Sequence, residues 1–155
     1  MITAEKLEKV KNTAHDFFSK TGISNFEVKV IEASNDESLN IDLLTDDAGF
    51  YIGERGRNIG AFETALRIVM KKNFGEIPNF HLDVNNYRSL KEGSLKELAK
   101  KAAHRARFYK KDVTLEAMSA YDRRIIHTEL APHPDIKTES IGEDKERRVV
   151  VRYIS

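Results

Sequence analysis

Gly53 and Gly56 stand where the chain could come close to a ligand. Glycine has no Cβ atom, so the backbone can turn sharply there and approach a bound molecule. A helix is predicted directly after these glycines, and a helix N-terminus offers free N–H groups and a positive dipole end to an anion. Arg55 and Arg57 add positive charge at this place, whereas Glu54 would repel a phosphate. The predicted anion-binding loop comprises Ile52, Gly53, Glu54, Arg55, Gly56 and Arg57.

Positive charge is concentrated in the second part of the chain, although the whole chain has a formal net charge of only +1. Residues 1–86 hold 10 Lys and Arg against 14 Asp and Glu, a net charge of −4. Residues 87–155 hold 16 against 11, a net charge of +5. This asymmetry predicts a basic face on the second part. The candidate phosphate contacts on its first predicted helix are Lys100, Lys101 and Arg105.

Arg123 and His127 lie one helical turn apart and would project from the same side of a helix. Arg123 could bind a phosphate while His127 stacks on a base or hydrogen-bonds to phosphate. The same spacing fits a half-buried pair that fixes the helix against a sheet, and spacing alone favours this second interpretation. Arg124 points elsewhere and could reach a different phosphate, and Arg148 could extend the basic face.

Other kinds of chemistry find little support in the residue types. Cysteine is absent, which excludes disulfides, thiol catalysis and thiolate metal ligands. The five histidines are scattered and include no His-x-x-x-His pair, so we expect neither a metal site nor a cofactor. A nuclease would need a cluster of carboxylates that holds a metal, and no nucleophile–base pair is recognisable. We therefore predict that the protein is not an enzyme.

The composition suits a globular protein, with 40% hydrophobic and 33% charged residues. The 155 residues are enough for one ordinary domain or two small ones. No apolar run approaches the length that spans a bilayer, and no basic-then-apolar leader follows the first residue. These features predict a cytoplasmic protein that does not insert into a membrane.

Hydrophobic periodicity predicts an α+β protein with a boundary after residue 86. The first part, residues 1–86, reads as helix, strand, strand, short helix, loop, helix and strand. Asn35-Asp36 supplies the turn between its first two strands. The predicted segments are 3–20, 26–31, 39–44, a helical turn from 46, a helix to about 72, and 80–84.

The second part, residues 87–155, begins with a long helix predicted to end at residue 109. Its expected apolar stripe consists of Leu95, Leu98, Ala102, Ala106 and Tyr109. A strand at 113–116 follows, then a helix that Ser119 caps and that ends near residue 130. Two strands at 136–140 and 148–154 flank a turn at 142–145.

Two motifs carry a resemblance to known domains. The segment from Ile52 to Gly56 and its helix resemble the core of a KH domain, whose Gly-x-x-Gly loop clamps a nucleic-acid backbone. The segment from Ser119 to His127 resembles the R-three-H signature, an Arg and a His separated by three residues. Further matching segments lie at 133–136, 140–142 and 147–151. The order of the two domains is similar to that of the bacterial Jag family, also called KhpB or EloR, over roughly residues 20–154.

This resemblance implies a type II KH domain (αββααβ) followed by a small R-three-H α/β domain with a three-stranded sheet. It implies non-catalytic binding of single-stranded RNA, with single-stranded DNA as an open alternative, and favours the binding role of Arg123 and His127. It also implies post-transcriptional regulation linked to cell elongation or division, or a link to membrane-insertion machinery. The N-terminal Jag domain and linker of longer members have no counterpart in this sequence.

A rival interpretation is a protein-interaction scaffold whose KH domain pairs with another KH protein, with RNA binding secondary. The resemblance implies a small single-KH protein as that partner, and a homodimer is the other open possibility. The acidic first part favours this rival, whereas the basic second part favours RNA.

Overall fold

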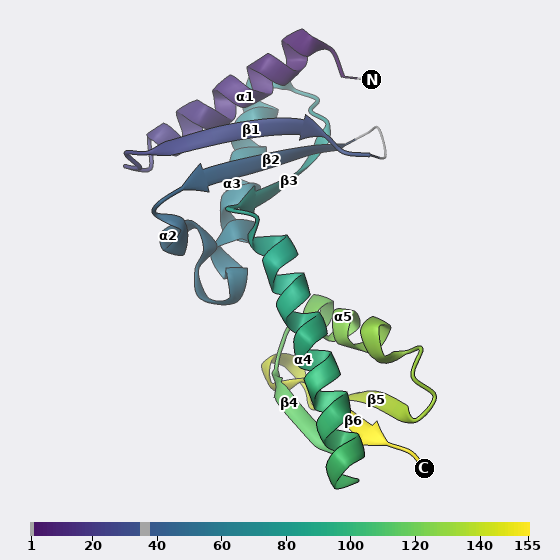
Figure 1. The fold of residues 1–155 in the computed structure, drawn as a ribbon. Helices are drawn as coiled ribbons and strands as arrows, with labels where there is room; N and C mark the ends of the chain where they lie inside the picture. Colours follow the sequence, from purple (N-terminus) through teal and green to yellow (C-terminus); the bar gives the residue numbers. More distant parts are fainter. Residues whose placement is uncertain (1, 35–37) are drawn as a thin grey trace. The chain divides into compact units, whose positions relative to one another are not determined.

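The computed structural model describes residues 2–34 and 38–155 (Figure 1). The predicted turn at Asn35-Asp36 lies outside the described residues. The chain divides into two compact units, residues 1–88 and 89–155, and each has its own hydrophobic core. The elements of the first unit are α1 (Ala4–Ser19), β1 (Phe26–Glu32), β2 (Ser38–Thr45), α2 (Ala48–Ile52), η1 (Glu54–Gly56), α3 (Arg57–Phe74) and β3 (Asn79–Val84).

The first unit has the αββααβ order predicted for a type II KH domain. Its sheet has the order β1-β2-β3, in which β1 and β2 are antiparallel and β2 and β3 are parallel. A parallel pair needs a crossover connection, which here contains α2 and α3. Alternate residues of each strand are buried on one face of the sheet, for example Ile41 on β2 and Leu82 on β3.

Helices α1 and α3 supply the apolar faces that cover this side of the sheet. Thr3 caps α1, since its Oγ1 atom accepts a hydrogen bond from the Lys6 N–H at 3.3 Å. Phe18 on α1 and Leu66 on α3 are fully buried at helical spacing from other core residues, as the periodicity predicted. The buried residues of the two helices are Val10, Ala14, Phe18, Ile59, Leu66 and Met70.

Side chains from two helices satisfy the outer edge of β3. Glu63 on α3 accepts a hydrogen bond from the Leu82 N–H at 2.9 Å. Arg67 donates to the Phe80 carbonyl at 2.9 Å, and Arg88 donates to the Leu82 carbonyl at 3.1 Å. An edge strand otherwise presents unpaired backbone groups to other chains. These bonds also attach Arg88 to the first unit, so the limit between the units lies inside the first turn of α4 (Tyr87–Tyr109).

The second unit packs two helices on one face of an antiparallel sheet, as predicted for the R-three-H part. Its strands have the order β4-β6-β5, with the central strand β6 paired to both others. Residues Val149 and Val151 of β6 face the helices, because they join the same buried cluster as Ala103 of α4 and Ile126 of α5. The remaining elements are β4 (Val113–Ala117), α5 (Ala120–Leu130), β5 (Ile136–Ile141), η2 (Asp144–Glu146) and β6 (Arg148–Tyr153).

The apolar stripe predicted for α4 is partly wrong. Leu98 is 38% exposed and Tyr109 is 62% exposed, although both were expected in the core. Ala99 and Ala103 are buried in their place, with 0% and 1% exposure. The prediction favoured large apolar residues, whereas the helix approaches the core through a row of small ones. The buried residues of α4 are Leu95, Ala99, Ala102, Ala103 and Ala106.

Replacing Glu63 should destabilise the first unit. In Glu63→Ala, the Leu82 N–H loses its acceptor at a site where the Glu63 side chain is only 19% exposed. The free energy of unfolding should fall by about 1–3 kcal/mol, the range for an unsatisfied buried donor. Glu63→Gln keeps an acceptor oxygen and should lose less. Urea unfolding followed by circular dichroism measures both, and equal stability of wild type and Glu63→Ala would contradict the assignment.

Candidate nucleic-acid interface

The glycine loop requires backbone conformations that few other residues adopt. Gly53 has φ 70° and ψ −178°, a region that is essentially restricted to glycine. Gly56 is left-handed with φ 77°, and Arg55 between them is also left-handed with φ 56°. The Gly53 N–H donates to the Gly49 carbonyl at 2.9 Å, which ends α2. The loop is therefore a defined turn between two helices.

Neighbouring side chains fill the space beside both glycines. A Cβ atom on Gly53 would lie 2.4 Å from Cγ of Asn58, whose Nδ2 donates to the Phe50 carbonyl at 2.9 Å. A Cβ atom on Gly56 would lie 2.6 Å from Cε1 of Tyr87. The fold itself thus requires glycine at both positions. A change such as Gly53→Asp would disturb folding as well as any ligand, so loop contacts are better tested at the exposed Arg57.

The charged residues of the loop are exposed at the start of α3. Glu54, Arg55 and Arg57 reach solvent, whereas Ile52 is half-buried. Gly56 provides no side-chain cap for α3, so the helix end is open to an anion. The exposed Phe50 ring beside this loop was missed in the sequence, although an aromatic residue three positions before the first glycine was an available signal.

The three basic candidates on α4, Lys100, Lys101 and Arg105, are all exposed. Lys100 lies 3.5 Å from Glu97 and 3.7 Å from Glu129, so its charge is partly balanced. These cations point away from the alanine stripe, because that stripe faces the sheet. A polyanion can therefore reach this side of α4 without disturbing the core.

Hydroxyl groups of β5 hold both ring nitrogens of His127. Nδ1 lies 2.6 Å from the Thr138 Oγ1 atom, and Nε2 lies 2.8 Å from the Ser140 Oγ atom. Burial, together with the nearby charge of Arg123, lowers the pKa of His127 from its usual 6.5. Arg123 itself donates to the Met118 carbonyl at 2.7 Å. The motif residues thus link α5 to β5 and to the loop before α5.

The structure brings some of the predicted contacts together and separates others. Arg123 and His127 are neighbours on α5. Arg124 is exposed and lines a groove of about 300 Å³ beside Lys96 of α4. Arg148 pairs with its neighbour Glu146 at 3.0 Å, and strand alternation directs it to the face of β6 opposite the helices. Arg148 therefore does not share a surface with His127. The six loop residues lie in the other unit.

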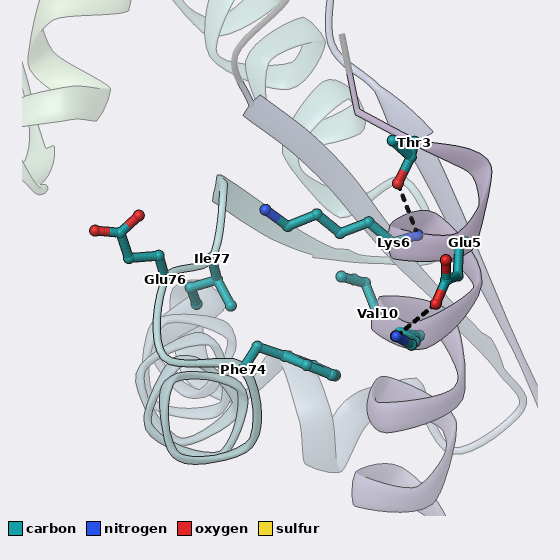
Figure 2. Close-up of a pocket in the computed structure, with 8 residues that line it drawn as sticks. Thr3, Glu5, Lys6, Val10, Phe74, Glu76 and Ile77 are labelled. Carbon is teal, nitrogen blue, oxygen red and sulfur yellow. Dashed lines mark hydrogen bonds and ion pairs between the residues drawn. The ribbon is translucent and has the colours of Figure 1, made fainter.

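A separate pocket of about 270 Å³ lies between the start of α1 and the loop after α3 (Figure 2). The side chains of Val10, Phe74 and Ile77 converge on it, and Lys6 extends across it (Figure 2). None of the predicted contacts lines this pocket.

Two further features concern metals and membranes. Within residues 2–34 and 38–155, no group of three or more His, Asp or Glu side chains is placed to hold a metal ion. In the same part of the chain, no helix combines the length and apolar character that crossing a bilayer requires.

Comparison with known proteins identifies the family. The model of the R-three-H domain matches residues 93–153. The RNA-binding protein KhpB of Clostridium symbiosum is 30% identical over 154 residues, which cover 97% of this chain and 69% of that protein. The chain belongs to the KhpB family. The family resemblance predicted from the two motifs is thereby confirmed.

Two other KhpB proteins are similar over their shared parts. RNA-binding protein KhpB of Bacillus subtilis is 34% identical over 119 residues, 76% of this chain and 57% of that protein. RNA-binding protein KhpB of Lactiplantibacillus plantarum is 36% identical over 114 residues, 74% of this chain and 35% of that protein. The chain thus spans little more than half of the Bacillus relative and about a third of the Lactiplantibacillus relative.

The lowered pKa of His127 predicts a pH dependence of stability. The unfolded chain takes up a proton as the pH falls through about 6.5, while the folded ring resists it. The contribution of this group should therefore be constant above that pH and destabilising below it. His127→Gln should remove this part of the pH dependence. Urea unfolding between about pH 5 and about pH 8 measures it.

The exposed His133 of the same unit provides the control, since His133→Gln should keep the wild-type pH profile. Profiles of wild type and His127→Gln that run parallel throughout would contradict a buried neutral ring.

Proposed function

We propose that this chain binds single-stranded RNA chiefly through α4 and α5, without catalysis. The two parts predicted at residues 1–86 and 87–155 would act as the KH and R-three-H domains. One observation carries the proposal: residues 100–111 contain six Lys and Arg and no Asp or Glu. The family supports it, since all three relatives are named as RNA-binding proteins and none is named as an enzyme.

Phosphate contacts would come mainly from the second unit. Lys100, Lys101 and Arg105 would attract the backbone from solvent, and Arg123 and Arg124 would extend this contact along α5. His127 would act mainly by holding α5 to β5, because both of its ring nitrogens already have hydroxyl partners. Arg148, on the opposite face of β6, would meet only a strand that passes around the sheet.

The KH loop would make the weaker contact. Residues 1–88 hold 11 Lys and Arg against 14 Asp and Glu, a net charge of −3 that opposes phosphate binding. The loop from Ile52 to Arg57 would still clamp a few nucleotides through backbone N–H groups and two arginines. A role in post-transcriptional regulation linked to cell elongation or division, and a cytoplasmic location, follow from the family resemblance.

Removing charge from α4 should weaken RNA binding and its salt dependence together. The variant Lys100→Gln, Lys101→Gln, Arg105→Gln should bind a short oligouridylate about 10-fold or more weakly in about 0.1 M salt. Since each phosphate contact on a single strand adds about 0.7 to the slope of log affinity against log salt, that slope should fall by about 2. Fluorescence anisotropy of the labelled strand measures both quantities.

A matched control removes three exposed lysines from α1 in the first unit. Lys6→Gln, Lys9→Gln, Lys11→Gln changes the net charge by the same amount and should keep nearly all affinity. Equal loss in the two variants would mean that overall charge, not α4, governs binding. An unchanged affinity in both, with no effect of salt, would contradict the proposed function.

A second candidate function is a scaffold in which the first unit pairs with another KH protein or with its own copy. The acidic charge of this unit favours it, and so does Ile68, which is 66% exposed on α3. An exposed β-branched residue on a helix gains no burial unless a partner covers it.

A charge on α3 tests this candidate. Ile68→Arg should shift a self-associating sample toward monomer in sedimentation analysis while RNA affinity stays unchanged. Ile31→Arg is the control, since Ile31 is 55% exposed on the sheet of the same unit. A wild-type chain that stays monomeric at every concentration would argue against the homodimer, and retention of a single-KH protein by Ile68→Arg would argue against that partner.

A further inference from the structure

The last turns of α4 expose two neighbouring aromatic side chains that the core does not use. Phe108 is 72% exposed and Tyr109 is 62% exposed. Among the residues that the structure describes, no large apolar side chain is more exposed than Phe108. The two rings meet edge to face with centroids 4.9 Å apart, and the His104 ring stacks beside Phe108 at 6.5 Å. Helix formation does not explain these residues, because aromatic side chains have lower helix propensity than alanine or lysine.

The two rings extend two rows of side chains along the exposed face of α4. Residues four apart are neighbours on a helix surface, so Tyr109 follows Lys101 and Arg105, and Phe108 follows His104. The buried alanine stripe lies on the other side of the helix. Cationic and aromatic side chains therefore share one solvent-facing surface.

Most cations of this surface have no acidic partner. Arg107 is held by Asp135, with Nη2 and Oδ1 2.9 Å apart, and this ion pair lies outside the surface. Within the described part of the chain, no carboxylate forms an ion pair with the four cations Lys101, Arg105, Lys110 and Lys111. These four charges are thus available to a polyanion.

Lys110 occupies a position where glycine is usual. It follows the last residue of α4 with φ 49°, and the Lys111 N–H donates to the Ala106 carbonyl at 3.3 Å to close the helix end. Helices that end in this way commonly have glycine at that position, because a side chain is strained there. The chain instead places a cation directly after the two rings.

We propose that the last turns of α4 form a base-stacking site for single-stranded nucleic acid, an inference that rests on the RNA-binding function proposed above. Bases stack on Phe108 and Tyr109, while Lys101, Arg105 and Lys110 bind the phosphates between them. Every base has a π-face, so the site tolerates many sequences. It is separate from the Arg–His motif, whose two residues lie on α5.

The test removes both rings and measures affinity for a short labelled oligouridylate by fluorescence anisotropy. Phe108→Ala with Tyr109→Ala should bind about 5-fold to about 100-fold more weakly, the range for loss of base stacking. Leu90→Ala is the matched control, since Leu90 is 65% exposed on the same helix, and it should bind like the wild type. Phe108→Tyr with Tyr109→Phe keeps both rings and should keep the affinity. Circular dichroism verifies that each variant is folded.

Two probes separate stacking from charge. An abasic oligonucleotide of equal length has phosphates without bases, so the double alanine variant should bind it as the wild type does. The chain contains no tryptophan, so Phe108→Trp introduces a single reporter. Its fluorescence should be quenched by oligouridylate and not by inorganic polyphosphate.

The outcomes distinguish this site from the function on which it rests. Wild-type oligouridylate affinity in the double alanine variant overturns the stacking site, and a change in its oligomeric state would then assign the rings to a protein contact. An equal loss of affinity for the abasic strand also overturns it. If the α4 charge variant loses binding and the aromatic variant does not, only the stacking site fails. If the wild-type chain does not bind RNA, the proposed function fails.

Discussion

The close packing of α4 against the sheet of the second unit depends on four small side chains. Ala99, Ala102, Ala103 and Ala106 are between 0% and 3% exposed, so the helix backbone lies near the valines of β6. A tightly packed interior leaves little freedom to rotate the helix, because larger side chains on that face would overfill the space. The orientation of every other side chain on α4 follows from this contact. The cations and aromatic rings reach solvent because the alanines do not.

The Arg–His motif illustrates how a sequence signature can serve structure and binding together. His127 joins α5 to β5 through two hydroxyl groups, and Arg123 holds the loop that precedes the helix. A half-buried neutral ring with both nitrogens engaged is costly to replace, since loss of either partner leaves a polar atom unsatisfied. The motif thus fixes the helix whose exposed side carries Arg124. Its importance for nucleic acid would then come partly from geometry rather than from direct contact alone.

The first unit shows the same combination at its glycine loop. The loop geometry requires glycine at both positions, and the side chains of Asn58 and Tyr87 occupy the space where a Cβ atom would lie. The neighbouring edge of β3 is closed by Glu63 and two arginines, which removes backbone groups that could pair with another chain. An acidic unit with a rigid loop and a closed edge suits a weak, positional contact. The basic second unit suits the stronger and more salt-dependent one.

The sequence by itself determined the features that depend on local residue order. Helix bounds for α4, the capping of α1 by Thr3 and the αββααβ order follow from periodicity, caps and turns, and the family follows from two short motifs. The tertiary structure decided which face of α4 is buried, because alanine has little hydrophobic signal and only contact with the sheet selects Ala99 and Ala103 over Leu98 and Tyr109. It also decided the partners of His127, which come from a strand more than ten residues away. Periodicity specifies a helix and its repeat, but the opposing surface specifies which residues of that repeat face inward.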